Sequence, residues 1–131
     1  MTQKNSIILA FCVLGIALMA AGLWVAGGPA TGRAEQRDEE RMADLVELHH
    51  LTYCLAETAE GVLPDQIDMS ETCQRDAALN DPFTGEAYEY QKISERAYKW
   101  CAGFELPDRA RDYWSGGFDP ETGCLQFTYR P

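Results

Sequence analysis

The sequence predicts an α+β protein with one transmembrane helix, followed by a long helix packed on a small antiparallel sheet of about three strands. Three observations lead to this prediction. Residues 7–26 form an uncharged run of twenty, the leucines that follow recur with a helical period, and aromatic residues nearer the C-terminus alternate with polar ones.

The run IILAFCVLGIALMAAGLWVA is long enough to cross a hydrocarbon core of ~30 Å as a helix. A cleaved signal peptide is the alternative, because Lys4 precedes the run and small residues follow it. The apolar part of a signal peptide is about 7–15 residues long, shorter than this run. We therefore favour an uncleaved anchor over residues 1–28.

Four small residues in the anchor stand four positions apart in pairs, a spacing that lets membrane helices approach closely. They are Ala17, Ala21, Gly22 and Ala26. A contact face for another membrane helix is one interpretation of this pattern. The general abundance of alanine and glycine in membrane spans is the other.

The orientation of the anchor rests on the cysteines. Basic residues flank the run on both sides, so their count does not place the N-terminus in the cytoplasm. Disulfides, however, persist only in oxidising compartments, and four cysteines follow the run. We therefore expect a bacterial inner-membrane protein with a cytoplasmic N-terminus and a periplasmic C-terminal domain.

The charge of the chain is concentrated after the anchor. All 21 acidic residues and ten of the eleven basic ones follow Gly28, which makes the net charge of that part near −11. Such a surface disfavours nucleic acid and anionic lipid as partners and favours a basic soluble protein. Solubility alone is the simpler explanation of the same charge.

The part of the chain after the anchor divides into a linker and one domain. The sequence GGPATG predicts a short flexible collar, with the linker at residues 29–34 and an α+β domain over 35–131. A helix is expected over Glu35–Thr58, where Leu45, Leu48, Thr52 and Leu55 recur at helical spacing. A glycine and a proline shortly after Thr58 end it.

Three later segments alternate aromatic and polar residues as half-buried strands do: EAYEYQKI, AYKWCAGFE and CLQFTYR. The turn sequences DPFTGE and DPETG lead into the first and the last of them. Aspartate can accept hydrogen bonds from its own backbone in such turns, and glycine supplies a positive φ. The sequence therefore predicts three short strands against the long helix.

The cysteines Cys54, Cys73, Cys101 and Cys124 allow three pairings. Cys101 and Cys124 lie on the non-aromatic face of their strands, and Cys54 lies away from the leucines, where the loop with Cys73 could return. We favour Cys54–Cys73 and Cys101–Cys124, each stabilising the domain by ~3 kcal/mol. A zinc site is the alternative, which the wide spacings and the lack of a CxxC pair disfavour.

No catalytic residue, cofactor or metal is expected, because the chain carries no recognisable nucleophile, phosphate-loop or metalloprotease motif. His49 falls at the edge of the apolar helix face and should pack in the core, whereas His50 should be solvated. Tyr113 and Trp114 have no place on a strand face and are the expected partner contact. A loop folded over the sheet is the equal alternative for these two residues.

The stretches LPDQI, DPFTGEAYEYQ and AYKWCAGFE resemble an arrangement in poorly characterised bacterial single-pass membrane proteins with an outer domain. They are more distantly similar to the sheet region of type II secretion pseudopilins. The resemblance covers roughly residues 37–105 and implies a pilin-like fold. Pseudopilins begin with a processing glycine, a phenylalanine and a glutamate at the fifth mature position, and Met1–Ile16 contains no acidic residue and no such site.

These observations lead us to expect a non-catalytic accessory subunit of a larger inner-membrane complex, respiratory, photosynthetic or transport. Its expected partners are the lipid bilayer, other integral membrane subunits and a basic soluble protein. A pseudopilin-like component of a secretion or filament apparatus is the alternative.

Overall fold

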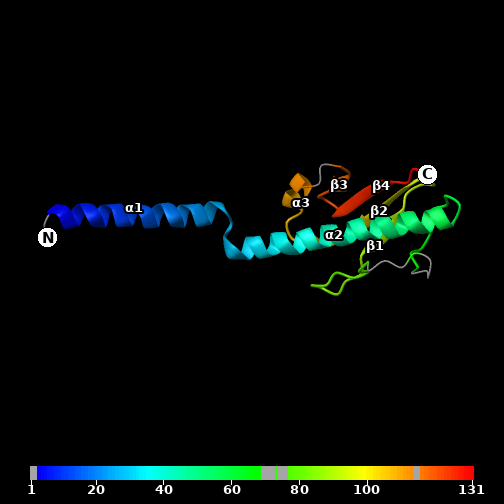
Figure 1. The fold of residues 1–131 in the computed structure, drawn as a ribbon, viewed down its shortest axis with the longest axis horizontal. Coiled ribbons are helices and arrows are strands. Elements are labelled where there is room, and N and C mark those ends of the chain that lie inside the picture. The colour runs from blue at the N-terminus through cyan, green and yellow to red at the C-terminus, as the bar shows by residue number, and fades with distance from the viewer. Residues whose placement is uncertain (1–2, 69–72, 74–76, 114–115) are drawn as a thin grey trace. The chain divides into compact units, whose positions relative to one another are not determined.

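The computed structural model describes residues 3–68, 73, 77–113 and 116–131, and its architecture is α+β as predicted (Figure 1). In chain order the elements are α1 (Gln3–Val25), α2 (Gly28–Thr58), β1 (Glu89–Lys92), β2 (Ala97–Cys101), α3 (Pro107–Tyr113), β3 (Phe118–Asp119) and β4 (Cys124–Thr128). The chain forms two compact units, Met1–Arg33 and Ala34–Pro131. They are described separately.

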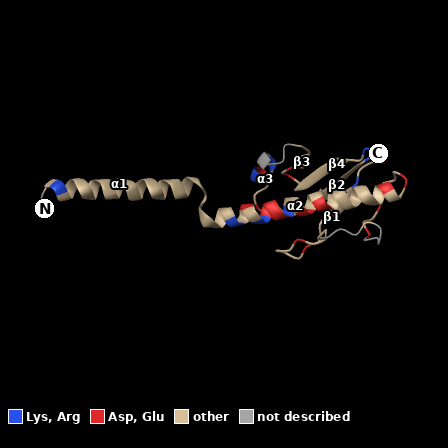
Figure 2. Ribbon diagram, in the orientation of Figure 1, with Lys and Arg blue, Asp and Glu red and all other residues tan. Residues whose placement is uncertain are grey.

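The first unit contains α1, which buries none of its residues. Figure 2 shows this helix without charge beyond its N-terminal end. By length and composition, this helix is long and apolar enough to cross a membrane. Within the described part of the chain it is the only such helix.

Residues 29–34, for which a flexible collar was predicted, are helical, because α2 begins at Gly28 and runs through them. Near this segment only Gly27 and Gly28, at the junction before α2, have a positive φ, of 82° and 70°. Pro29 falls in the first turn of α2, where its missing N–H has no partner to lose. The helix therefore starts earlier than the predicted Glu35.

The second unit packs α2 against one face of an antiparallel sheet with the strand order β1-β2-β4-β3. Trp100 of β2 lies opposite Tyr90 of β1 and Leu125 of β4. Trp100 and Leu125 are fully buried, and the Trp100 indole N–H donates to Thr52 of α2 at 3.1 Å. The alternation of aromatic and polar residues therefore predicted correctly which face of these strands is buried.

Two elements go beyond the three predicted strands. β3 is a fourth strand of only two residues, too short to give an alternating pattern. α3 is a helix of seven residues with a proline at its start and Asp108 in its first turn. Both lie between β2 and β4 in the chain, where the sequence shows charged residues and glycines and no apolar period.

Candidate functional site

Three buried charges lie together at the start of the core face of α2. Arg41 is 1% exposed, Asp38 5% and Asp81 4%. The Arg41 guanidinium donates to Asp81 Oδ2 at 2.6 Å and to Asp38 Oδ1 at 2.7 Å. This cluster ties α2 to the DPFTGE turn, because the other Asp81 oxygen accepts the backbone N–H of Phe83 at 2.8 Å.

Asp38 also holds the segment that leads into α3. Its two carboxylate oxygens accept the backbone N–H groups of Glu105 at 3.0 Å and of Leu106 at 2.7 Å. A buried carboxylate that accepts backbone N–H groups and pairs with arginine has its polar atoms satisfied. Asp38 and Arg41 therefore fix the position of α3 against α2.

The half-exposed carboxylate of Glu105 completes the cluster. Hydrogen bonds from Arg37 at 2.7 and 2.6 Å, and then from Arg41 at 3.0 Å, lower the pKa of Glu105 to about 2. Burial acts to raise the pKa of Asp81, but the Phe83 N–H and Arg41 outweigh it, so this pKa is lowered. Both carboxylates are ionised at neutral pH.

A half-open cleft of about 180 Å³ lies between α2 and α3, beside this cluster. Its residues are Glu35, Asp38, Glu39 and Met42 of α2, with Leu106, Arg109 and Ala110 on the opposite side. Arg109 and Glu35 form an ion pair across the cleft. The interior is mostly apolar, whereas its α2 rim carries acidic groups.

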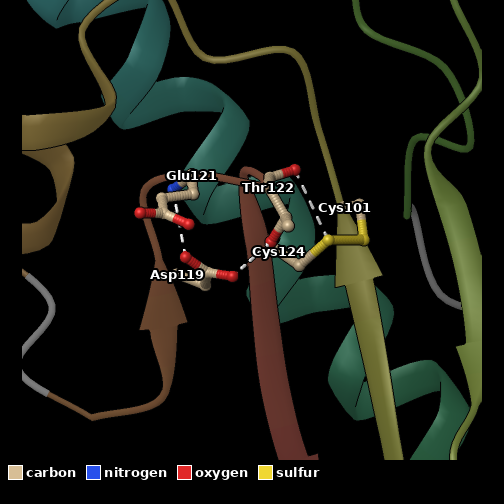
Figure 3. Close-up of a disulfide and its surroundings, with 5 residues drawn as sticks. All are labelled: Cys101, Asp119, Glu121, Thr122 and Cys124. Atoms are coloured by element: carbon tan, nitrogen blue, oxygen red, sulfur yellow. Dashed lines mark hydrogen bonds between the residues drawn. A yellow bond between two sulfur atoms is a disulfide. The ribbon is translucent and has the colours of Figure 1, made fainter.

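The face of the sheet turned away from α2 carries the disulfide Cys101–Cys124, whose residues are register partners on β2 and β4 (Figure 3). Figure 3 also shows the adjoining DPETG turn, in which Asp119 accepts the Glu121 N–H at 3.0 Å and the Thr122 hydroxyl at 2.7 Å. Gly123 ends this turn with a φ of 66°, and an added Cβ would lie 2.4 Å from the Ala102 carbonyl oxygen. The turn therefore requires glycine there.

The second disulfide joins Cys54 of α2 to Cys73. The two bridges are those favoured from the sequence. All four cysteines after the anchor are thus oxidised, and the alternative zinc site, which needs their thiolates, is not formed by them. Among the described residues, no group of three His, Cys, Asp or Glu side chains is placed to hold a metal ion.

Comparison with protein-family models, curated proteins and solved structures gives no match to this chain.

His49 lies partly buried between α2 and the sheet, as expected. Its ring stacks on Phe127 with centroids 4.1 Å apart, and its Nδ1 lies 2.6 Å from the Tyr98 hydroxyl. Burial, and then the charge of His50, lowers the pKa of His49. His49 is therefore a packing residue in this structure, while His50 is exposed.

The other predicted site residues are less informative. Four of them, Ala17, Ala21, Gly22 and Ala26, are all exposed on α1 in the first unit. Tyr113 ends α3, and Trp114 lies outside the described residues. The structure thus leaves both expected contact surfaces as predictions.

Sequence reasoning missed the buried charge cluster and the cleft. A signal for the cluster existed, because Asp38 and Arg41 stand seven and four positions before Leu45, on the same helix face. The cleft had no such signal, since it depends on where Asp38 holds α3.

Proposed function

We propose that this protein is a non-catalytic accessory subunit of a larger complex in a bacterial inner membrane, such as a respiratory, photosynthetic or transport complex. In this proposal α1 spans the bilayer with its N-terminus in the cytoplasm. The disulfide-bonded domain then lies in the periplasm and contacts other subunits or a basic soluble protein.

The observation that carries the proposal is that α1 is apolar from Ile7 to Val25 and buries none of its residues. An exposed apolar helix of this length is stable in lipid and not in water. The two disulfides support an oxidising side for the domain.

The use of the buried charges supports a contact role for the domain. Arg41, Asp38 and Asp81 neutralise one another and hold α3 and a turn against α2. Every buried side-chain nitrogen and oxygen in the described part of the chain has a hydrogen-bond partner. These polar groups therefore stabilise the positions of α3 and of the turn on the surface of the domain.

The test is purification of the full chain, tagged at its C-terminus, from its own membranes in mild detergent, followed by quantitative mass spectrometry. The proposal expects other integral membrane proteins at stoichiometric ratios. A tagged chain that carries no such protein, although membrane complexes from the same sample stay intact, would contradict it.

A pseudopilin-like component of a secretion or filament apparatus is the second candidate. The packing of the long helix α2 on an antiparallel sheet favours it. Mass spectrometry of the mature N-terminus distinguishes the two, because processing and methylation there would support the filament role. An unprocessed N-terminus supports the accessory role.

A further inference from the structure

We propose that the cleft between α2 and α3 binds a short basic segment of a partner protein that inserts one apolar side chain between lysines or arginines. This inference deepens the proposed function and rests on it. It names the surface of the domain that makes the contact and the chemistry of the segment that fits there.

The size of the cleft limits how large an apolar side chain of the partner can enter it. A volume of about 180 Å³ is close to that of the engineered cavity, roughly 150 Å³, that binds benzene in another protein. It therefore has room for one aliphatic or aromatic side chain. Met42 lines the cleft with a flexible thioether, which adapts to occupants of different shape.

The charges at the rim determine which residues of the partner fit beside the inserted side chain. Arg109, the basic residue of the cleft, already pairs with Glu35, and the Asp38 carboxylate is occupied by Arg41 and by backbone N–H groups. Glu39 is exposed and has no ion-pair partner within the described parts of the chain. Lysine or arginine beside the inserted side chain would meet this carboxylate.

The surroundings of the cleft extend the same preference. Glu40 follows on the exposed side of α2, and the part of the chain after Gly28 has a net charge near −11. Acidic residues dominate this stretch of α2 in Figure 2. The carboxylates of α2 would repel an acidic segment, whereas the net negative charge of the domain attracts a basic one at long range and the cleft then holds it.

The cleft is also preformed. Asp38 fixes the start of α3 through two backbone hydrogen bonds, and the ion pair between Arg109 and Glu35 joins the two helices again. A binding surface that is ordered before its ligand arrives loses less conformational entropy on binding. A short segment can therefore bind without folding of the domain around it.

The test uses the full chain in phosphatidylcholine nanodiscs with ¹³C-methyl-labelled methionine. The probe is a capped five-residue peptide with one leucine between two lysines on each side. We expect a saturable shift of the Met42 methyl signal, assigned by its loss in Met42→Leu, while the Met19 signal of α1 stays in place. The same peptide with glutamates in place of lysines should give no shift.

Two variants supply a matched control. Glu39→Lys reverses the free rim charge and should weaken peptide binding about fivefold, whereas Glu40→Lys makes the same change one residue away, outside the cleft, and should weaken it less than twofold. Equal effects of the two variants would overturn the proposal. So would an unmoved Met42 signal, an equal response to the glutamate peptide, or joint shifts of Met19 and Met42, which indicate lipid partitioning.

A Met42 shift that depends on protein concentration without peptide would assign the cleft to a second copy and would also overturn the proposal. The two proposals fail separately. A chain that purifies with membrane subunits but does not bind the peptide retains the accessory role and loses this cleft. A chain that binds the peptide but purifies alone retains this cleft and loses the accessory role.

Discussion

Arg41 donates its Nε–H to Asp81 Oδ2 at 2.6 Å, and both side chains are almost completely buried. The two residues stand forty positions apart and join the long helix to the turn that precedes β1. Burial of charges is costly unless they are paired, and loss of the Asp81 charge would leave Arg41 with only Asp38 and Glu105 as carboxylate partners. The pair therefore holds the DPFTGE turn in a fixed position against α2.

The first prediction concerns this pair. Asp81→Asn keeps the shape of the side chain and can still accept the Phe83 N–H, but it removes the charge that faces Arg41. We expect the free energy of unfolding to fall by about 2 kcal/mol, the loss of one buried charge-assisted hydrogen bond. Urea unfolding of the full chain in detergent, followed by tryptophan fluorescence, measures this loss.

The second DP turn supplies the control. Asp119 accepts the N–H of the residue two positions on, as Asp81 does, but it is exposed and bonds a threonine hydroxyl instead of an arginine. Asp119→Asn should therefore lower the free energy of unfolding clearly less than Asp81→Asn does. Similar losses at the two positions would contradict a special role for the buried ion pair.

The second prediction is a loss of stability in acid. Hydrogen bonds from Arg37 and Arg41 lower the pKa of Glu105 from its ordinary 4.5 to about 2. The unfolded chain therefore binds a proton at Glu105 at a higher pH than the folded chain does. The contribution of Glu105 is fully present above about pH 4.5 and is lost as the pH falls toward 2, and the lowered pKa of Asp81 acts in the same sense.

Urea midpoints between pH 7 and pH 2.5 check this prediction. The midpoint should fall below about pH 4.5, and Glu105→Gln should make that fall shallower. Glu95→Gln, which removes an exposed glutamate in the turn between β1 and β2, is the control substitution. A Glu105→Gln profile as steep as that of the unchanged chain would show that the pairs with Arg37 and Arg41 do not hold this carboxylate ionised.

The third prediction concerns the disulfides. Cys54–Cys73 and Cys101–Cys124 close loops with sequence separations of 19 and 23. Replacing either pair by alanines should lower the free energy of unfolding by ~3 kcal/mol, because each bridge restricts the unfolded chain. Peptide mapping without reductant should recover these two cross-linked pairs. Crossed pairs or four free thiols would contradict the structure, and free thiols would also remove the argument for an oxidising compartment.

These features differ in how far the sequence could reveal them. The alternation of Tyr98 and Trp100 with polar residues identifies the buried face of β2, because a pleated strand turns successive side chains to opposite faces. The position of Cys101 on the other face made its pairing with Cys124 predictable. In both cases a local period carries the information.

The cluster and cleft depend on contacts between distant segments, and no local period describes them. Asp38 binds backbone N–H groups of residues 67 and 68 positions later in the chain. The flexibility expected of residues 29–34 differs from the structure because a local signal was misinterpreted. The glycines and proline there suggested a flexible segment, although only Gly27 and Gly28 adopt left-handed φ and Pro29 suits the first turn of a helix.

The fourth prediction concerns the small residues of α1. If Ala17 and Ala21 face another membrane helix, Ala21→Ile should prevent close approach and reduce the recovery of co-purifying membrane subunits about tenfold, the equivalent of about 1.4 kcal/mol. Met19→Ile introduces the same residue on the opposite side of α1 and should leave recovery unchanged. Equal recovery with both variants would favour the simpler explanation that small residues are merely common in membrane spans.

The central claim is that α1 anchors this domain to other membrane subunits. Native mass spectrometry of the full chain, extracted from its own membranes in mild detergent, tests it most directly. The account predicts a particle heavier than the 14.6 kDa chain, which releases the intact chain and at least one other integral membrane protein on activation. A particle that contains the 14.6 kDa chain alone would contradict the account.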